Sequence, residues 1–559
     1  MKKRSAIRRL LPALAGVVTV GAVPAVRAFD FNIGQLDASL DTDLTWTLAL
    51  RTAKPDPFNQ TVYGNRYLFQ DKWDIFQNQI KGSHTLEVRG DSYGGLVRGN
   101  WFYDAEMASQ NLPEAADNRA VHHGDITDAF VYKRFFDDQS LSVRLGKQVI
   151  SWGESTFIGG SLNDINTVDI SKLRTPGSEL KDAYVGTPSI DVAFNFLENY
   201  TLEAFALFSY HEIKLDPVGS FYTTLDAITD GGGYANTRVG GRPRCLAPDG
   251  VGCDLLGGLL TRTGDNLGSG GEWGVALRRF LPNFGNGGEV AIYYQNLHDH
   301  LPAISGIVGK GLFQVDYPEN IERWGASFNT NYAGLAYSGE LSYRRNAPLQ
   351  MTLPLLLSTP FGGPFTPLMS GYSVGEGIKG YERVERYQAQ FTVQKNWGVV
   401  HSLNADAAST IAEIAWGWLG GLPSLQPLTM NGRVLKGAGG NTLYNVFESD
   451  VSKDFGKLVI RHSMTYQAAL FNLIALEPNV AFSWDFHGYS NEVGGAKLMV
   501  EGRKAVTLGL NFNYGNERWK GGIAYTNFFG KDNSVNAANS RLNATDDRDF
   551  LSFTASYSF

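Results

Sequence analysis

Residues 550–559 read FLSFTASYSF, and this closing stretch alternates strictly between apolar and small polar side chains. One parity carries an apolar series that ends on an aromatic residue, and the other carries only serine and threonine: Leu551, Phe553, Ala555, Tyr557 and Phe559 against Ser552, Thr554, Ser556 and Ser558. A soluble domain usually ends in polar residues that fray. Period-two alternation up to the last residue predicts instead an ordered β-strand with one apolar face.

The same alternation recurs along the chain. LAYSGELSYR (335–344) places Glu340 and Arg344 on the polar parity, and RYQAQFTVQ (386–394) places Arg386, Gln388 and Gln390 there. A charged residue on the apolar parity of a membrane barrel costs about 2–4 kcal/mol at mid-depth, and these strands keep charges off it. The pattern therefore fits strands with one face toward lipid and the other toward a polar lumen.

The N-terminus has the features of an export signal. MKKRSAIRR is basic, LLPALAGVVTVGAVPA is apolar, and small residues precede a cleavage site after Ala28. A membrane anchor is the alternative, but Pro12 and Pro24 break the short apolar run. Removing residues 1–28 takes six of the 49 basic residues, so 43 remain against 56 acidic ones and the net charge is about −13. This balance argues against a nucleic-acid partner.

Composition and loop lengths favour one class of membrane protein. No later stretch has eighteen consecutive apolar residues, yet aromatic residues make up 12% of the chain. Short turns, such as those at 91–95 and 331–334, alternate with long insertions, such as 153–186, 213–270 and 348–379. We expect residues 29–559 to form one all-β domain, a transmembrane antiparallel β-barrel of about 18 strands (alternative 16) with long external loops. A secreted soluble β-protein is the competing interpretation.

Two details of the barrel follow. The alternation gives about nineteen strand candidates, and an even number is required if both ends lie in the periplasm, so one candidate, expected within 441–487, is in excess. The last strand should pair with the first, because an unpaired edge in lipid is costly. The piece FDFNIGQLD (29–37) is too small to be a plug domain but could fold inside the barrel. In this class the barrel-assembly machinery commonly recognises a C-terminal strand such as the one ending at Phe559.

The segment 142–186 departs from the alternation. It starts as a strand, but Lys147 falls on the outward parity, which suggests a bulge or the end of the lipid band, and the alternation stops after Glu154. Turns and a short helix near Ser171–Leu173 are expected next. We predict an inward-folded loop, either bracing the lumen wall through ion pairs or forming a constriction that selects the ligand. The candidate residues are Arg144, Lys147, Gln148, Trp152, Glu154, Asp164, Asp169 and Arg174.

The stretch GKQVISWGES (146–155) resembles the G-(R/K)-Q-x-x-x-W-G-E-(S/T) motif of a proteobacterial outer-membrane family known as domain-of-unknown-function family 1302. Phe208-Ser209-Tyr210 and the run 488–530 also resemble the family pattern, so the resemblance covers nearly the whole mature chain. It implies a barrel in the outer membrane of a Gram-negative bacterium, often associated with the movement or degradation of sterols and other lipids. The chain differs from the family pattern in its unusually apolar 348–379 segment.

Further ligand and covalent features lie in the insertions. LQMTLPLLLSTPFGGPFTPLMSGYS (349–373) is rich in apolar residues, and we expect it to be a hatch, a lipid contact or a ligand site through Met351, Leu355, Phe361, Phe365 and Met369. Cys245 and Cys253 are expected to form a local disulfide after export. No histidine lies close to them, so we expect no metal site and no cofactor.

The sequence is consistent with three functions to different degrees. The favoured hypothesis is an outer-membrane channel or transporter for hydrophobic or amphipathic small molecules such as lipids or sterols. The alternative is a general diffusion porin for small polar solutes, which the polar inward parity would also suit. A hydrolase is disfavoured, because the adjacent His462 and Ser463 point to opposite faces of a strand and no G-x-S-x-G motif is present.

Overall fold

The computed structural model describes residues 29–55, 68–223, 228–229, 234–236, 259–307, 312–350, 375–422, 429–430, 433–434, 451–492, 498–514, 518–530, 543 and 545–559. Several predicted features lie outside these residues. They are the signal peptide 1–28, the cysteines at 245 and 253, and the apolar residues at 351, 355, 361, 365 and 369.

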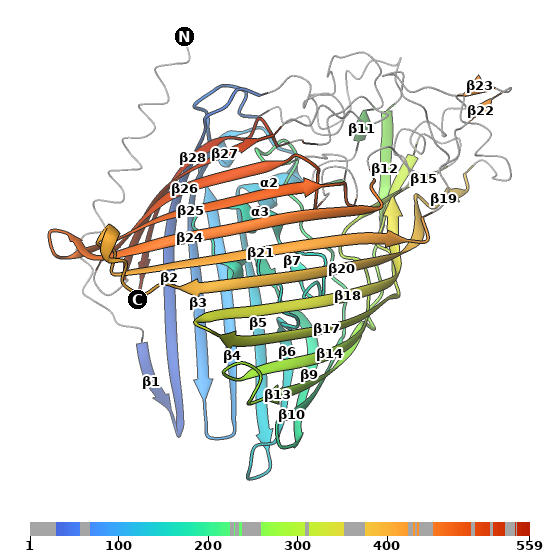
Figure 1. Ribbon diagram of the computed structural model, residues 1–559. Coiled ribbons are helices and arrows are strands. Elements are labelled where there is room, and N and C mark those ends of the chain that lie inside the picture. The colour runs from blue at the N-terminus through green and yellow to red at the C-terminus, as the bar shows by residue number, and fades with distance from the viewer. Residues whose placement is uncertain are drawn as a thin grey trace.

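Eighteen antiparallel strands form a closed barrel (Figure 1). In order along the chain, and also around the barrel, they are β2 Leu36–Arg51, β3 Ile75–Arg89, β4 Tyr93–Asp104, β5 His122–Phe135, β6 Leu141–Gln148, β9 Thr187–Leu197, β10 Tyr200–Leu207, β13 Trp273–Leu281, β14 Gly288–Leu297, β17 Ile321–Tyr332, β18 Leu335–Gln350, β20 Tyr381–Asn396, β21 Ala407–Gly420, β24 Asp454–Leu470, β25 Ile474–His487, β26 Lys504–Tyr514, β27 Trp519–Phe529 and β28 Phe550–Ser558. The predicted fold class and the preferred strand number are confirmed.

The first and last barrel strands close the cylinder. β2 pairs with β28 from Asp43 opposite Ser558 to Arg51 opposite Phe550. Phe559 adds two backbone hydrogen bonds to Thr42, with N···O distances of 2.8 and 2.9 Å. The pairing of β2 with the C-terminal strand therefore runs from Thr42 to Arg51, so this stretch of β2 has no open edge, as a strand in lipid requires. The alternating closing stretch is the sealing strand of the barrel.

The N-terminal piece lies in the wall and not inside the barrel. β1 Phe29–Ile33 pairs with the beginning of β2, from Phe29 opposite Leu40 to Ile33 opposite Leu36. It occupies the same edge of β2 as β28 does, just beyond the end of the C-terminal strand. The side chains of Phe29 and Ile33 are 58% and 49% exposed, so the possibility that this piece folds inside the barrel is wrong. Backbone pairing along a free strand edge explains the difference.

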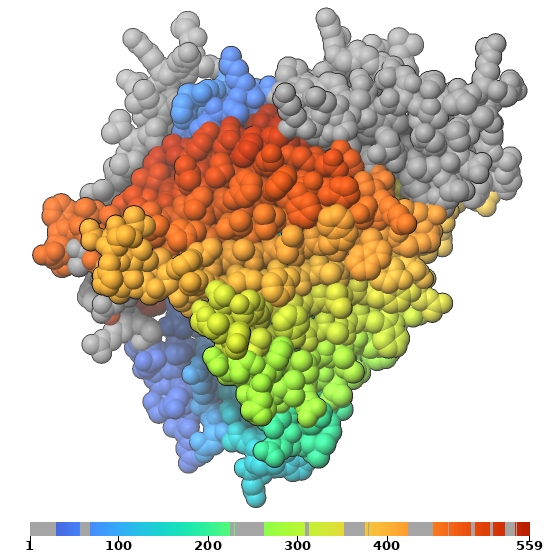
Figure 2. Space-filling view, in the orientation of Figure 1, coloured from blue at the N-terminus to red at the C-terminus, as the bar shows by residue number. Residues whose placement is uncertain are grey.

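Alternate residues of each strand face outward and inward, and the outward residues are apolar whereas the inward residues are polar. Trp324, Leu341 and Phe391 are 51%, 59% and 41% exposed, whereas Glu340 and Gln388 on the same strands are 3% and 1% exposed. Figure 2 shows the outer face from β14 to β27 as adjoining tilted bands of atoms. An apolar outer surface around a closed barrel is the arrangement that a lipid bilayer requires. None of the helices among the described residues is long and apolar enough to cross a membrane.

Smaller elements lie in the insertions. They are η1 Met107–Ser109, α2 Glu114–Ala120, β7 Thr167–Val168, α3 Ile170–Arg174, α4 Leu180–Ala183, β8 Tyr184–Val185, β11 Tyr234–Asn236, β12 Leu259–Asn266, β15 Ala303–Ile307, β16 Leu312–Asp316, β19 Gly377–Ile378, η5 His401–Leu403, β22 Thr429–Met430 and β23 Arg433–Val434. β12, β15 and β16 join β11 and β19 in a separate five-stranded sheet.

Apolar clusters occupy the interior where insertions meet the inward side of the wall. One joins Trp152 and Leu162 to Phe205 and Tyr293. A second joins Ile158 to wall residues that include Phe455 and Val459. A third gathers aromatic residues around Phe76. The barrel interior is therefore partly filled by packed side chains that come from the segment between β6 and β9 and from other insertions.

Candidate functional site: a loop folded into the lumen

The segment between β6 and β9, residues 149–186, folds into the barrel, and we call it the luminal loop. β6 ends at Gln148, one residue after the predicted parity break at Lys147 and six residues before Glu154, where the alternation was expected to stop, and β9 begins at Thr187. There is no bulge at Lys147, because β6 pairs in continuous register with both β5 and β9, so the alternative of a strand end near Lys147 holds. The loop is thus an insertion that starts where the strand stops.

Two hydrogen bonds between one side chain and the backbone of another residue close the neck of the loop. The Asn166 side chain accepts from Ile150 N at 2.8 Å and donates to Ile150 O at 2.6 Å. Both residues are buried, at 8% and 1% exposure. A side-chain amide that pairs with both the backbone N–H and the backbone C=O of one residue replaces the hydrogen bonds that a neighbouring strand would make. It fixes residues 150–166 as a closed unit, and we call residues 153–164 the apex of the luminal loop.

The apex binds two wall glutamates through consecutive backbone N–H groups. Glu340 on β18 accepts from Glu154 N at 2.6 Å and from Ser155 N at 3.2 Å. Glu413 on β21 accepts from the next three N–H groups, those of Thr156, Phe157 and Ile158, at 3.0, 2.7 and 3.1 Å. Both glutamate side chains are buried, at 3% and 0% exposure. Converging backbone N–H groups form a site for an anion, and here the wall supplies the anion.

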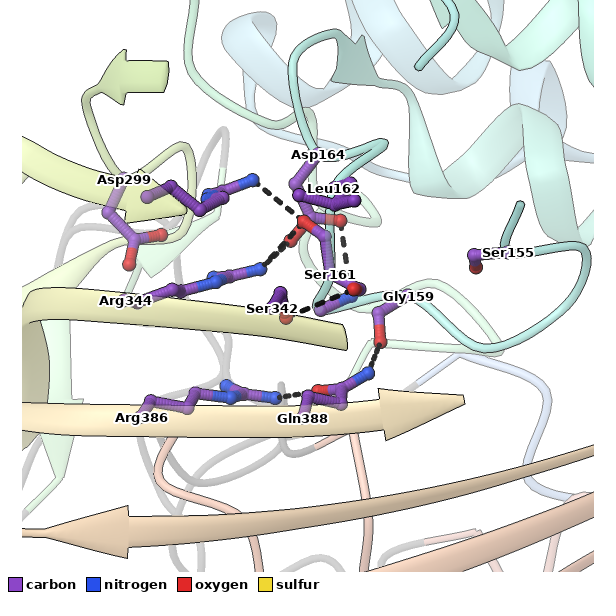
Figure 3. A network of polar contacts seen from close by, with 12 residues as sticks. Ser155, Gly159, Ser161, Leu162, Asp164, Asp299, Ser342, Arg344, Arg386 and Gln388 are labelled. Atoms are coloured by element: carbon purple, nitrogen blue, oxygen red, sulfur yellow. Dashed lines mark hydrogen bonds and ion pairs between the residues drawn. The ribbon is translucent and has the colours of Figure 1, made fainter. Parts of the chain in front are cut away.

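The apex carbonyl groups bind wall donors in the same way. Gln390 donates to Ile158 O at 2.7 Å, and Gln388 donates to Gly159 O at 3.0 Å. Arg323 and Arg344 both donate to Ser161 O, at 2.8 and 3.2 Å. Figure 3 shows Arg344, Arg386 and Gln388 on their strands directed toward the apex. The apex is thus held mainly by wall side chains acting on its backbone.

Two glycines make this close approach feasible. Gly153 has φ +85°, and a Cβ there would lie 2.5 Å from Glu340 Oε2. Gly160 has φ +91°, and a Cβ there would lie 2.7 Å from an Arg386 guanidinium nitrogen. L-residues with side chains adopt this backbone region rarely. Gly153 belongs to the Trp-Gly-Glu part of the motif, so its presence there has a physical reason.

The apex reaches far around the barrel. β10, β13, β14, β17, β18 and β20 lie between β9, where the loop ends, and β21, which carries Glu413. The helical half of the loop, residues 169–183, binds strands on the other side of β6. Lys81 on β3 pairs with Asp182 at 2.6 Å, and Lys181 lies 3.5 Å from Asp43 on β2. The luminal loop therefore links distant parts of the wall across the lumen.

Five of the predicted site residues lie in the luminal loop. Trp152 donates to Glu203 at 2.8 Å, and Glu154 accepts from Asn329 at 2.8 Å. Asp164 pairs with Arg344 at 2.5 Å. Asp169 caps α3 by accepting from Ser171 N and Lys172 N, and Arg174 pairs with Asp216.

The other three predicted residues belong to the wall at the root of the loop. Arg144 pairs with Asp191 on β9 at 2.6 Å, and Lys147 lies 3.4 Å from Asp125 on β5. Gln148 is fully buried and donates to Ser189 O at 3.2 Å. These contacts brace the strands from which the loop departs, and they do not bring the three residues to the apex.

Two acidic side chains of the luminal loop have pKa values that are shifted in opposite directions. Burial raises the pKa of Glu154, and the nearby carboxylates of Glu289 and Glu340 add to this effect, although the hydrogen bond from Asn329 opposes it. Burial also acts to raise the pKa of Asp164, but Arg344 and Arg323 outweigh it and the pKa is lowered. Acidification therefore protonates Glu154 before Asp164.

The most important partner that the sequence did not single out is Glu413. It was overlooked because AEIAW (412–416) is a short part of a strand and gives no sign of which insertion it meets. A charged residue within an otherwise apolar and aromatic strand, on the inward parity, was the available signal. Among the described residues, no group of three or more histidine, cysteine, aspartate or glutamate side chains could hold a metal ion.

These features define the class of the protein. A closed eighteen-stranded barrel with an apolar outside and a polar, loop-filled inside is a transmembrane β-barrel of the outer-membrane type. The model of the family described as "Protein of unknown function (DUF1302)" matches residues 9–559. The chain belongs to this family, and the resemblance seen in the GKQVISWGES motif is confirmed.

Comparison with other proteins gives little information about the function of the chain. No curated protein matches the chain. Among solved structures, Acinetobacter baumannii OccAB4 matches with a TM-score of 0.42 and 9% identity over 93% of this chain and 98% of that chain. Pseudomonas aeruginosa OccK9 (OpdG) matches with a TM-score of 0.41 and 10% identity over 93% and 98% of the two chains. At these values the likenesses carry no functional argument.

Proposed function

We propose that the protein is an outer-membrane channel or transporter for hydrophobic or amphipathic small molecules, in which the luminal loop forms the constriction. The supporting observation is the apex itself, five consecutive N–H groups of which bind two buried glutamates of the wall. A loop held this firmly across a lumen narrows the lumen for as long as the loop is docked. It leaves passage to molecules that bind its surfaces or displace it.

The ligand class rests on the chemistry of the interior. Apolar clusters around Trp152 and Phe76 lie within the barrel, where a pore for small polar solutes has no need of them. The candidate residues Trp152, Glu154, Asp164, Asp169 and Arg174 shape the constriction, whereas Arg144, Lys147 and Gln148 support its root. No catalytic role is proposed for any of them.

The location follows from the class. Residues 1–28 direct export and are removed, the strand ending at Phe559 is presented to the barrel-assembly machinery, and the outer face contacts the lipids of a Gram-negative outer membrane. The apolar residues of segment 349–373 would supply a first contact for the ligand.

Two measurements test the proposal. A deletion strain should take up sterol-like or long-chain compounds more slowly, and the gene on a plasmid should restore uptake. The purified barrel in a planar bilayer should show little or no steady current. A large, steady and weakly selective current would contradict the proposal and support the general diffusion porin. Unchanged uptake of every apolar compound tested would contradict transport of this ligand class.

A further inference from the structure

A pocket lies inside the barrel between the helical half of the luminal loop and the wall strands β3 and β4. Its empty space, which includes solvent at its open mouth, is about 750 Å³. Lys81, Asn100 and Asp104 line it from the wall, and Lys172 lines it from α3. The insertion after β10 adds the remaining side, residues 216–222. This pocket is separate from the apex, which binds the wall farther around the barrel.

One side of the pocket is aromatic. Phe76 and Phe221 stack with their ring centroids 3.9 Å apart and an interplanar angle of 10°. Tyr222 meets Phe76 edge to face at 5.7 Å. Met107 and Ala120 extend this apolar side, and both are buried. Such a surface suits the apolar body of a ligand.

The charged groups of the pocket are nearly all paired. Asp104 accepts three backbone N–H groups, those of residues 78, 106 and 107. Asp182 pairs with Lys81, Asp216 pairs with Arg174, and Arg119 pairs with Asp169. Each lining acid therefore has a cationic or backbone partner, although the second carboxylate oxygen of Asp182 is buried without a hydrogen-bond partner among the described residues.

Lys172 is the exception among the charged groups that line the pocket, all of which lie in described residues. Its ammonium group donates to the neutral side chain of Asn100 at 3.0 Å, and no carboxylate of the described residues is within ion-pair distance. Burial lowers the pKa of Lys172, although the carboxylates of Asp169, Asp125 and Asp182 act in the opposite direction. Those three carboxylates are bound to Arg119, Lys147 and Lys81. An ammonium group with three donors retains capacity for an anionic partner.

The pocket also holds buried polar atoms that have no partner among the described residues. They include the hydroxyl groups of Ser220 and Tyr222, both of which can donate a hydrogen bond. A buried hydroxyl without a partner costs about 1–3 kcal/mol, so native structures seldom retain one without a reason. A ligand with an acceptor group would satisfy these donors together with Lys172.

We propose that this pocket binds an amphipathic monoanion, with its carboxylate at Lys172 and its apolar body against Phe76, Phe221 and Tyr222. This inference rests on the proposed function and narrows its ligand class, because an apolar molecule without a negative charge would leave the Lys172 ammonium group unpaired. The pocket then serves as a resting site beside the constriction.

Binding measured on the purified, detergent-free full-length mature barrel in amphipol tests the inference. The probes are octanoate, 1-octanol and octylammonium, which share one apolar chain and differ in charge. We expect octanoate to bind at least tenfold more tightly than either of the other two. Equal affinity for octanoate and 1-octanol, or tighter binding of octylammonium, would overturn the inference, and this comparison needs no variant.

Variants locate the site. Lys172→Met should weaken octanoate binding at least tenfold and leave 1-octanol binding unchanged, whereas Phe221→Ala should weaken both. Lys214→Met is the matched control, because Lys214 pairs with Glu212 and does not line the pocket. Octanoate affinity that is the same in Lys172→Met as in the parent protein would overturn the assignment to Lys172.

Different results would contradict the pocket inference and the transport proposal. If octanoate does not bind but the deletion strain loses uptake of neutral apolar compounds, the pocket inference is wrong and the transport proposal stands. If octanoate binds at Lys172 but no compound depends on the protein for uptake, the pocket is a binding site and the transport proposal is wrong.

Discussion

The two parts of the luminal loop are held to the barrel in different ways. At the apex, backbone N–H and C=O groups bind side chains of the wall, such as Glu340, Glu413 and Gln390. In the helical half, side chains of the loop bind side chains of the wall, as in the pair between Lys81 and Asp182. The position of the apex therefore depends mostly on wall residues, whereas that of the helical half depends on the loop's own charges.

The largest effect should come from removing both apex carboxylates. Glu340→Ala with Glu413→Ala leaves five consecutive N–H groups without acceptors, and each buried unsatisfied group costs about 1–3 kcal/mol. We expect the apex to leave the wall and the steady conductance in planar bilayers to rise several-fold.

The matched control changes the apex and leaves the wall intact. Thr156→Ala keeps the backbone N–H that binds Glu413, so conductance should stay at the parent value. If Thr156→Ala opened the barrel as much as the double glutamate variant, the apex would be held by its side chains, and the comparison drawn above would be wrong.

The docking of the helical half of the luminal loop should depend on its ion pairs with the wall. Asp182→Asn leaves the Lys81 ammonium group largely buried without its ion pair, a change that costs about 3 kcal/mol or more when the charge is fully buried and somewhat less here, because Lys81 is 12% exposed. We expect faster hydrogen exchange at residues 171–183, measured by mass spectrometry, and unchanged exchange at 153–164. Equal acceleration in both parts would show that they move as one unit.

Loss of the neck amide should have an intermediate effect. Asn166→Ala removes both hydrogen bonds to Ile150, at a cost of about 2 kcal/mol. Exchange at Ile150 and its neighbours should accelerate roughly tenfold or more, while the apex remains bound to the two glutamates. Asn163→Ala, at a half-buried position nearby, is the control and should leave the exchange at Ile150 unchanged.

Mild acidification should have the smallest effect. The pKa of Glu154 is raised in the docked loop, so the docked state binds a proton more tightly than a displaced loop with an ordinary carboxyl group. Lowering the pH from 7 toward 5 therefore favours docking, because Asp164, with its lowered pKa, stays ionised over this range. Residual conductance should fall as the pH falls, and Glu154→Gln should abolish the pH dependence. Conductance that rises on acidification would contradict the assignment.

The sequence predicted the structural features that depend on period-two alternation. Alternation located the strands, the closing role of 550–559 and the polar interior positions, since one face of each strand must meet lipid. The parity break at Lys147 lay close to the start of the luminal loop, and the helix expected near Ser171 is found as α3. Patterning carries no information about which wall residues an insertion reaches, so Glu413 was not identified. The N-terminal strand β1 was misplaced because its pairing depends on a strand edge that is visible only in the folded barrel.

A cross-link between the apex and the wall tests the central claim most directly. Ser161 Oγ lies 3.1 Å from Ser342 Oγ on β18 (Figure 3). In a background with Cys245→Ser and Cys253→Ser, the pair Ser161→Cys with Ser342→Cys should form a disulfide in isolated outer membranes, detected by mass spectrometry after digestion. The account predicts nearly complete cross-linking in the parent loop and a marked loss when Glu340→Ala and Glu413→Ala are added. Absence of the cross-link from a correctly folded barrel would contradict a loop docked across the lumen.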